Sequence, residues 1–275
     1  MIFTLELLVV GAVTGLVSGL IGVGGGFIFI PLLTLIGVPM RSAAGLSLLY
    51  VAFTATSGAA SHYRQGTTDF MVASAVAPAA LITVPVGSYY SGILPNSILQ
   101  VTFGLLVLAA ASALQWQSTR RNPFPGVSIL GTGMNRPIWV VVRRAKVQGN
   151  EYLFPVSLLR GVAVGGVTGF LAGLLGLGGG SLLVVLLMLV VGVPAPIAAG
   201  TSLLAILIPA IAGAITHYGL GHINIVSAIP AVLAGILGSV LGARGTVILS
   251  EARLQSIMIW LLALVAVYMI GRGIL

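Results

Sequence analysis

The feature that most constrains this chain is a glycine-rich interruption of an apolar stretch, and the chain contains it twice. Residues 15–38 read GLVSGLIGVGGGFIFIPLLTLIGV, and residues 169–193 read GFLAGLLGLGGGSLLVVLLMLVVGV. Glycine suits sharp turns and close approaches of the backbone, and consecutive glycines weaken a continuous helix by ~1 kcal/mol each. The pattern therefore predicts a break between two apolar helical arms, and its recurrence predicts an internal duplication.

Composition places both breaks in a membrane. The chain is 58% hydrophobic and only 6% charged, whereas soluble domains are typically ~25% charged. We therefore predict an all-α polytopic membrane protein. Backbone groups that a break leaves unpaired in hydrocarbon must be buried by protein or reached by water, so we expect the breaks inside the helix bundle.

The arm that follows the first break is short. Residues 27–38 are 12 residues, and at ~1.5 Å per residue they cover roughly 18 Å of a ~30 Å hydrocarbon core. This length predicts a re-entrant hairpin with residues 5–21. A helix that restarts at a break directs N–H groups and a positive dipole end toward it, which suits an anion. The candidate substrate-binding residues of the breaks are Gly24, Gly25, Gly26, Gly178, Gly179 and Gly180.

Other glycines have a plainer interpretation. Gly15, Gly19 and Gly22 lie three or four residues apart in an apolar arm, which is the spacing of close helix packing in membranes. We interpret these three as packing residues.

The rest of each half has the same plan. Three apolar segments long enough to cross follow each predicted hairpin, and a basic stretch separates the halves. The predicted organisation is a membrane repeat over residues 1–116, a basic cytoplasmic linker over 117–156 and a second repeat over 157–275. Within the linker, residues 138–142 and 152–154 flank a turn-like segment, which predicts a small β-hairpin.

Arginine and lysine counts bear on the topology. If each hairpin returns to its own side, each repeat makes three crossings and the second repeat is inverted relative to the first. That arrangement leaves only Arg41 and Arg272 of the 12 basic residues outside. Parallel repeats would leave three outside. Because basic residues concentrate in the cytoplasm, the count favours inverted repeats with both termini outside.

Two histidines occupy matched positions at the end of one helix in each repeat, His62 and His217, 155 residues apart. Imidazole changes its charge near neutral pH, so both are candidates to bind an anion or pass a proton. The alternative is that both are interfacial caps beside Tyr63 and Tyr218. The sequence leaves both roles open.

Neutral polar side chains supply the remaining candidates. Ser47, Thr201 and Ser202 lie near the start of the helix after each hairpin. Their hydroxyls can donate to an oxyanion or bond the preceding turn of their own helix. Gln100 and Gln255 are matched in the two repeats, and either reaches a ligand or bonds across helices.

No catalytic constellation is present. The chain has no cysteine, four acidic residues and no zinc or phosphate-loop motif. We predict no catalytic residues, no metal and no cofactor. Because half of the basic residues lie in one loop between membrane segments, we interpret them as a topology signal and expect no nucleic-acid partner. The expected partners are a small anion and the lipid bilayer, and a homo-oligomer stays open.

The segments GLVSGLIGVGGGFIFIPLL, GFLAGLLGLGGGSLLV and AAGTSLL together resemble the sulfite exporter TauE/SafE family of bacterial membrane permeases over nearly the whole chain. The resemblance implies a multi-pass inner-membrane transporter that exports small sulfur-containing anions such as sulfite or sulfoacetate. One departure is Leu46, which stands where the second repeat has Thr201. The alternatives are a membrane-embedded enzyme, and a channel or uptake permease for another small anion.

Overall fold

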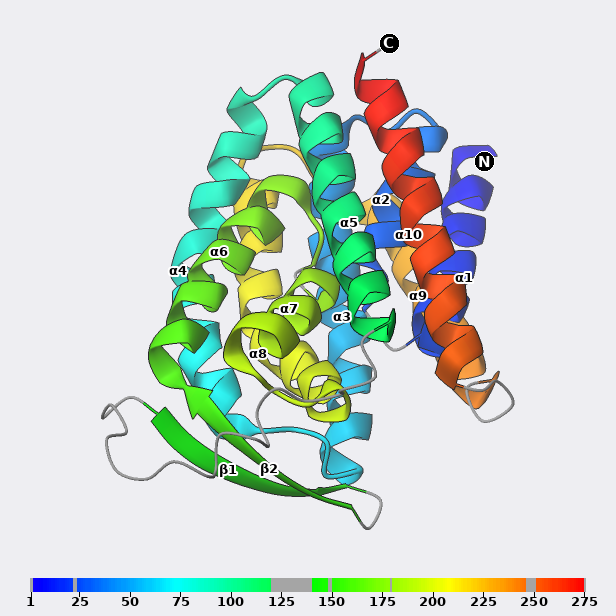
Figure 1. Ribbon diagram of the computed structural model, residues 1–275. Coiled ribbons are helices and arrows are strands. Elements are labelled where there is room, and N and C mark those ends of the chain that lie inside the picture. The colour runs from blue at the N-terminus through cyan, green and yellow to red at the C-terminus, as the bar shows by residue number, and fades with distance from the viewer. Residues whose placement is uncertain are drawn as a thin grey trace.

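The computed structural model describes residues 2–21, 24–119, 140–147, 150–178, 180–245 and 251–274. The first half contains α1 (Ile2–Ile21), α2 (Gly26–Leu35), α3 (Met40–Arg64), α4 (Phe70–Ile93) and α5 (Asn96–Thr119). The second contains α6 (Leu158–Leu175), α7 (Gly180–Leu186), the π-helix η2 (Leu187–Val191), α8 (Ala195–Gly219), α9 (Ile225–Gly245) and α10 (Glu251–Ile274). Between them lie the strands β1 (Val140–Val147) and β2 (Asn150–Ser157) (Figure 1).

Five of the described helices are long and apolar enough to cross a membrane by length and composition: α3, α4, α5, α6 and α8. Shorter apolar stretches lie within α1, α2, α9 and α10 and along α7 with η2. This distribution confirms the predicted all-α membrane protein.

Both glycine breaks are present, and the helices that follow them are short. Gly24 and Gly25 have φ values of 75° and 73°, and Gly176 and Gly178 have 71° and 62°. Only glycine adopts these left-handed conformations without strain. The 10-residue α2 is ~15 Å long, and α7 with η2 is of similar length. Neither second arm spans a ~30 Å core.

The two halves pack through exchanged helix pairs. α1 of the first half lies along α9 of the second, and α6 of the second lies along α4 of the first. Small residues allow the close approach, since a Cβ on Gly15 would meet the carbonyl oxygen of Gly235, and one on Gly173 that of Val84. The packing interpretation of Gly15 is confirmed. α3 with α8 and α5 with α10 complete the pattern.

Matched helices run in opposite directions in Figure 1. The N- and C-termini lie at one end of the bundle, here called the terminal end, and the β-hairpin lies at the hairpin end. α1 starts at the terminal end, whereas α6 continues directly from β2 and leads away from the hairpin. α5 runs toward the hairpin end and α10 away from it.

The predicted β-hairpin is confirmed, with longer strands than expected. β1 and β2 pair antiparallel from Val140 opposite Ser157 to Val147 opposite Asn150. Phe154 of β2 is buried in a cluster that includes Val72 of α4 and Ile197 of α8. The hairpin therefore covers the ends of both helices.

Candidate functional site

The two glycine breaks meet inside the bundle. A Cβ placed on Gly26, the first residue of α2, would lie 2.7 Å from the carbonyl oxygen of Leu177 in the second break. It would also lie 3.0 Å from Oγ of Ser47 in α3. Gly26 is therefore a point of contact between the first break, the second break and α3.

The second break lies against α3 as well. A Cβ on Gly176 would collide with the backbone of Ala44, and one on Gly178 would collide with the side chain of Val51. Both glycines also have left-handed backbone conformations, so a side chain at either position is disfavoured by backbone strain as well as by the lack of space. The two breaks thus share one location beside the first half of α3.

Three hydroxyl side chains surround the first break. Thr14 and Ser47 are fully buried, and Ser18 is nearly so. A Cβ on Gly25 would lie 3.1 Å from Oγ of Ser18 and 3.2 Å from Cγ2 of Thr14. Within the described part of the chain, Oγ1 of Thr14 and Oγ of Ser47 have no hydrogen-bond partner. A buried hydroxyl without a partner costs ~1–3 kcal/mol, so two at one place call for a functional reason.

Several backbone amides at the breaks are already satisfied. The N–H of Gly26 donates to the carbonyl of Gly24, and those of Ile28 and Phe29 donate to the carbonyl of Gly25, each at 3.0 Å. In the second break the N–H of Gly180 donates to Gly178 at 2.8 Å. An anion would have to compete for these amides, whereas the hydroxyls of Thr14 and Ser47 are free to donate.

The matching hydroxyls of the second half are satisfied within their own helices. Thr168, which matches Thr14 across 154 residues, donates to the carbonyl of Val164 at 2.7 Å. Ser202, the match of Ser47, donates to the carbonyl of Ala199 at 2.9 Å. The two breaks therefore have similar backbones but different available donors.

His62 and Thr201 lie at the hairpin end, away from the breaks. Nδ1 of His62 is 2.8 Å from Oγ1 of Thr67 in the loop between α3 and α4. Oγ1 of Thr201 accepts a hydrogen bond from the backbone N–H of Asp69 at 2.9 Å. Both contacts fix the start of α4, so the interfacial interpretation suits this end of the molecule.

His217 lies at the opposite, terminal end, fully buried. Its Nε2–H donates to the carbonyl of Gly173 near the end of α6 at 3.0 Å, because a carbonyl can only accept. Its Nδ1 is 3.0 Å from Nδ1 of His222 in the loop between α8 and α9. The structure thus separates the two histidines and gives each a partner five residues further along the chain.

The start of α4 carries a charge that its counterpart lacks. Asp69 is 4% exposed, caps α4 by accepting from two backbone N–H groups, and pairs with Nε of Arg143 in β1 at 2.8 Å. The cation of this pair comes from β1 of the linker and not from Arg64, which is the basic residue nearest to Asp69 in the sequence. Asn224 caps α9 in the same way without a charge.

The comparison that decides the family is a match of its sequence model, described as sulfite exporter TauE/SafE, to residues 7–269. The chain belongs to this family. The TauE/SafE chain is also 29% identical over 210 residues to the probable membrane transporter protein YunE of Bacillus subtilis, covering 71% of each chain. No solved structure matches it.

Other relatives have the same kind of name. A probable membrane transporter protein of Haemophilus influenzae is 28% identical over 193 residues, covering 64% of this chain and 72% of the relative. The probable membrane transporter protein YdhB of Bacillus subtilis is 29% identical over 189 residues, covering 68% and 67%. Family and relatives support membrane transport, and with the apolar helices they make this a multi-pass membrane protein.

The remaining candidates of this TauE/SafE protein are not drawn together. Gln100 is buried in α5. Gly179 and the side chain of Gln255 lie outside the described residues. Among the described residues, no three His, Asp or Glu side chains form a group that could hold a metal ion.

Sequence reasoning missed Thr14 and Ser18. The sequence contained a signal for them. Residues four apart lie on one face of a helix, so Thr14 and Ser18 place two hydroxyls on the same face of an otherwise apolar arm, shortly before the glycines. Among the predicted polar residues whose side chains are described, Ser47 is the one that contacts the first break.

Proposed function

We propose that this protein carries a small sulfur oxyanion, sulfite or an organosulfonate such as sulfoacetate, across the bacterial inner membrane in the direction of export. The substrate would bind where the two breaks meet. The observation that carries the proposal is a pair of buried hydroxyls, those of Thr14 and Ser47, that have no hydrogen-bond partner within the described ranges and whose side chains lie beside Gly25 and Gly26.

The chemistry of this place suits an oxyanion. Hydroxyl groups donate hydrogen bonds to charged oxygens, and such bonds contribute ~1.5–3 kcal/mol each. Neutral donors also let the anion leave, because no permanent ion pair has to be broken. The family name and the transporter names of the relatives support transport over a membrane-embedded enzyme.

The architecture supports a carrier built from two inverted repeats. Exchanged packing of α1 with α9 and of α6 with α4 is what a two-fold relation between halves produces. The opposed directions of α1 and α6 in Figure 1 support an axis lying in the plane of the membrane. Substrate sites of such transporters lie at broken helices near the midplane, between the repeats.

The experiment that tests the proposed function is flux into proteoliposomes. Sulfite, sulfoacetate, taurine and sulfate would be compared, each with and without a pH gradient. We expect saturable flux of sulfite or sulfoacetate. The proposed substrate class would be contradicted if none of the four anions were transported while a positive-control transporter gave a signal in the same assay.

The inverted arrangement has its own test. The chain contains no cysteine, so a single cysteine at Gln65 or at Gly221 can be labelled without background. These residues lie just after the ends of α3 and α8, and inverted repeats place them on opposite sides of the membrane. Labelling of both from the same side would contradict the inversion.

A further inference from the structure

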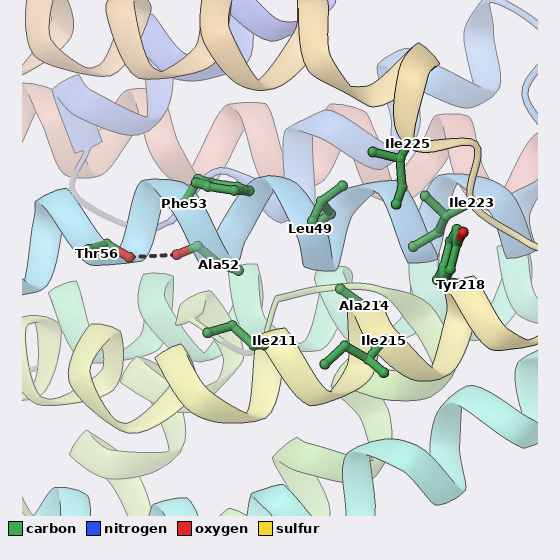
Figure 2. Close-up of a pocket in the computed structure, with 10 residues that line it drawn as sticks. All are labelled: Leu49, Ala52, Phe53, Thr56, Ile211, Ala214, Ile215, Tyr218, Ile223 and Ile225. Carbon is green, nitrogen blue, oxygen red and sulfur yellow. Dashed lines mark hydrogen bonds between the residues drawn. The ribbon is translucent and has the colours of Figure 1, made fainter.

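A groove separate from the breaks runs between α3, α8 and the start of α9. Its volume is about 360 Å³, within the ~300–1,000 Å³ of small-molecule sites. It is lined by Leu49, Ala52, Phe53, Thr56, Ile211, Ala214, Ile215, Tyr218, Ile223 and Ile225. Figure 2 shows most of these side chains along antiparallel α3 and α8, with Tyr218 and Ile223 at one end and Thr56 and Ile211 at the other, and Ile225 comes from the start of α9.

The groove is apolar and faces outward. Phe53 and Ile215 are 52% and 65% exposed on a helix bundle that lies in a membrane. The hydroxyl of Thr56 donates to the carbonyl of Ala52 at 2.8 Å, so it offers no free donor (Figure 2). Apart from the exposed Tyr218 at its end, the groove offers a hydrocarbon chain only apolar contacts, which suit it and do not suit the anion that we propose as substrate.

One cation lies beyond the Tyr218 end of the groove. Arg41 is on the same face of α3 as Gly45, Leu49, Ala52 and Thr56, because these residues are three or four apart. Gly45 lies against Ile223 at the groove end. Arg41 is about 12 Å from Leu49 along the helix axis.

Arg41 is partly buried and has no ion pair among the described residues. The whole chain has four acidic residues against 12 basic ones, so a second copy brings few carboxylates to neutralise it. Phospholipid headgroups are an abundant source of phosphate groups for a basic residue near the end of a membrane-spanning helix.

We propose that this groove binds one anionic phospholipid, with an acyl chain between α3 and α8 and the headgroup phosphate on Arg41. The site is particular to one face. The residues that match Arg41 and Ala52 in the second half are Pro196 and Leu207. Pro196 has no charge that could bind a phosphate. Leu207 has a larger side chain than Ala52 and leaves less space for an acyl chain.

The test is lipid titration of the detergent-purified protein, followed by native mass spectrometry and thermal unfolding. Palmitoyl-oleoyl phosphatidylglycerol is compared with the zwitterionic phosphatidylcholine of the same chains. We expect saturable binding of one phosphatidylglycerol and weaker binding of phosphatidylcholine. Arg41→Gln should weaken phosphatidylglycerol binding roughly five-fold, the contribution of one basic residue, and Arg41→Lys should restore it.

Matched variants separate the site from general lipid contact. Arg272→Gln removes an exposed charge from α10 at the same end and should leave binding unchanged. Ile211→Trp fills the groove at a position that is 45% exposed, so the variant should fold and should bind both lipids more weakly. Leu264→Trp, at a position on α10 that is 69% exposed, should change the binding of neither lipid. Equal loss in Arg41→Gln and Arg272→Gln would overturn the proposal. The proposal would also be overturned if the parent protein were a dimer and Ile211→Trp made it a monomer without weakening lipid binding. The groove would then hold a second copy of the chain and not a lipid.

Discussion

In the first half of the chain the glycine break lies beside hydroxyls that have no partner among the described residues, whereas in the second half the matching hydroxyls donate to carbonyls of their own helices. Thr14 and Thr168 are the same residue at matched positions, yet only Thr168 bonds the preceding turn. Ser47 and Ser202 differ in the same way. The matched hydroxyls of the two halves thus differ in their hydrogen bonding, and under the proposed function the first break supplies the donors to the anion.

The largest expected effect comes from placing a methyl group in the first break. In Gly25→Ala the new Cβ would lie 3.0–3.2 Å from Ser18 and Thr14 on a left-handed backbone. We expect sulfite affinity to fall on the order of 100-fold, since the methyl group would push on the side chains of Thr14 and Ser18 that line the break. Affinity would be measured by calorimetry in detergent.

The control is Gly178→Ala in the second break, where the methyl group meets Val51 instead. A left-handed alanine costs ~1–2 kcal/mol, so this variant should lose stability and keep its residual affinity. Equal losses of affinity in both variants would remove the distinction between the breaks.

The two histidines are expected to differ in their contribution to stability. His217 is fully buried and donates to Gly173, so His217→Ala leaves a cavity and an unpaired carbonyl, at a cost of ~2–4 kcal/mol. His62 is partly exposed, and its ring bonds Thr67 of its own loop while its Cβ packs against Gly200 of α8, so His62→Ala should cost ~1 kcal/mol. Thermal unfolding of the two variants measures the difference, and a larger loss for His62→Ala would refute the assignment.

The helix caps provide a smaller contrast. Arg143→Gln leaves the Asp69 carboxylate buried without its cation, which should cost about 2 kcal/mol, between values for exposed and buried pairs. Adding Asp69→Asn copies the uncharged cap of Asn224 in the other half and should recover most of that loss. If the unfolding temperature of the double variant is no higher than that of Arg143→Gln alone, the unpaired charge of Asp69 is not the cause of the loss.

The smallest effect concerns pH. Burial, and then the charge of Arg41, lower the pKa of His222 from its ordinary 6.5. Protonation therefore favours the unfolded chain, and stability is lost as pH falls from about 6.5 toward the lower pKa of the folded state. Besides Arg41, His217 faces this imidazole. We expect His222→Gln to flatten the pH dependence of the unfolding temperature, and an unchanged profile would exclude this loop as its source.

The breaks, the membrane fold and the hairpin were open to prediction because their signals are local. Glycine runs and apolar periodicity report on backbone and solvent directly. The unpartnered hydroxyls could not be predicted from the sequence, since a threonine in a membrane helix ordinarily bonds a carbonyl of the preceding turn. Whether it does depends on a rotamer set by neighbours, as Thr14 and Thr168 demonstrate. The separation of His62 from His217 likewise follows from antiparallel packing of α3 and α8.

The central claim is that the first break supplies the donors that hold the anion. Its most direct test is calorimetric titration of sulfite into four variants, Thr14→Val, Ser47→Ala, Thr168→Val and Ser202→Ala, each assayed for folding by thermal unfolding. We expect the first two to weaken binding about ten-fold each, and the last two to bind as the parent does. Equal affinities in all four, or losses confined to Thr168→Val and Ser202→Ala, would contradict it.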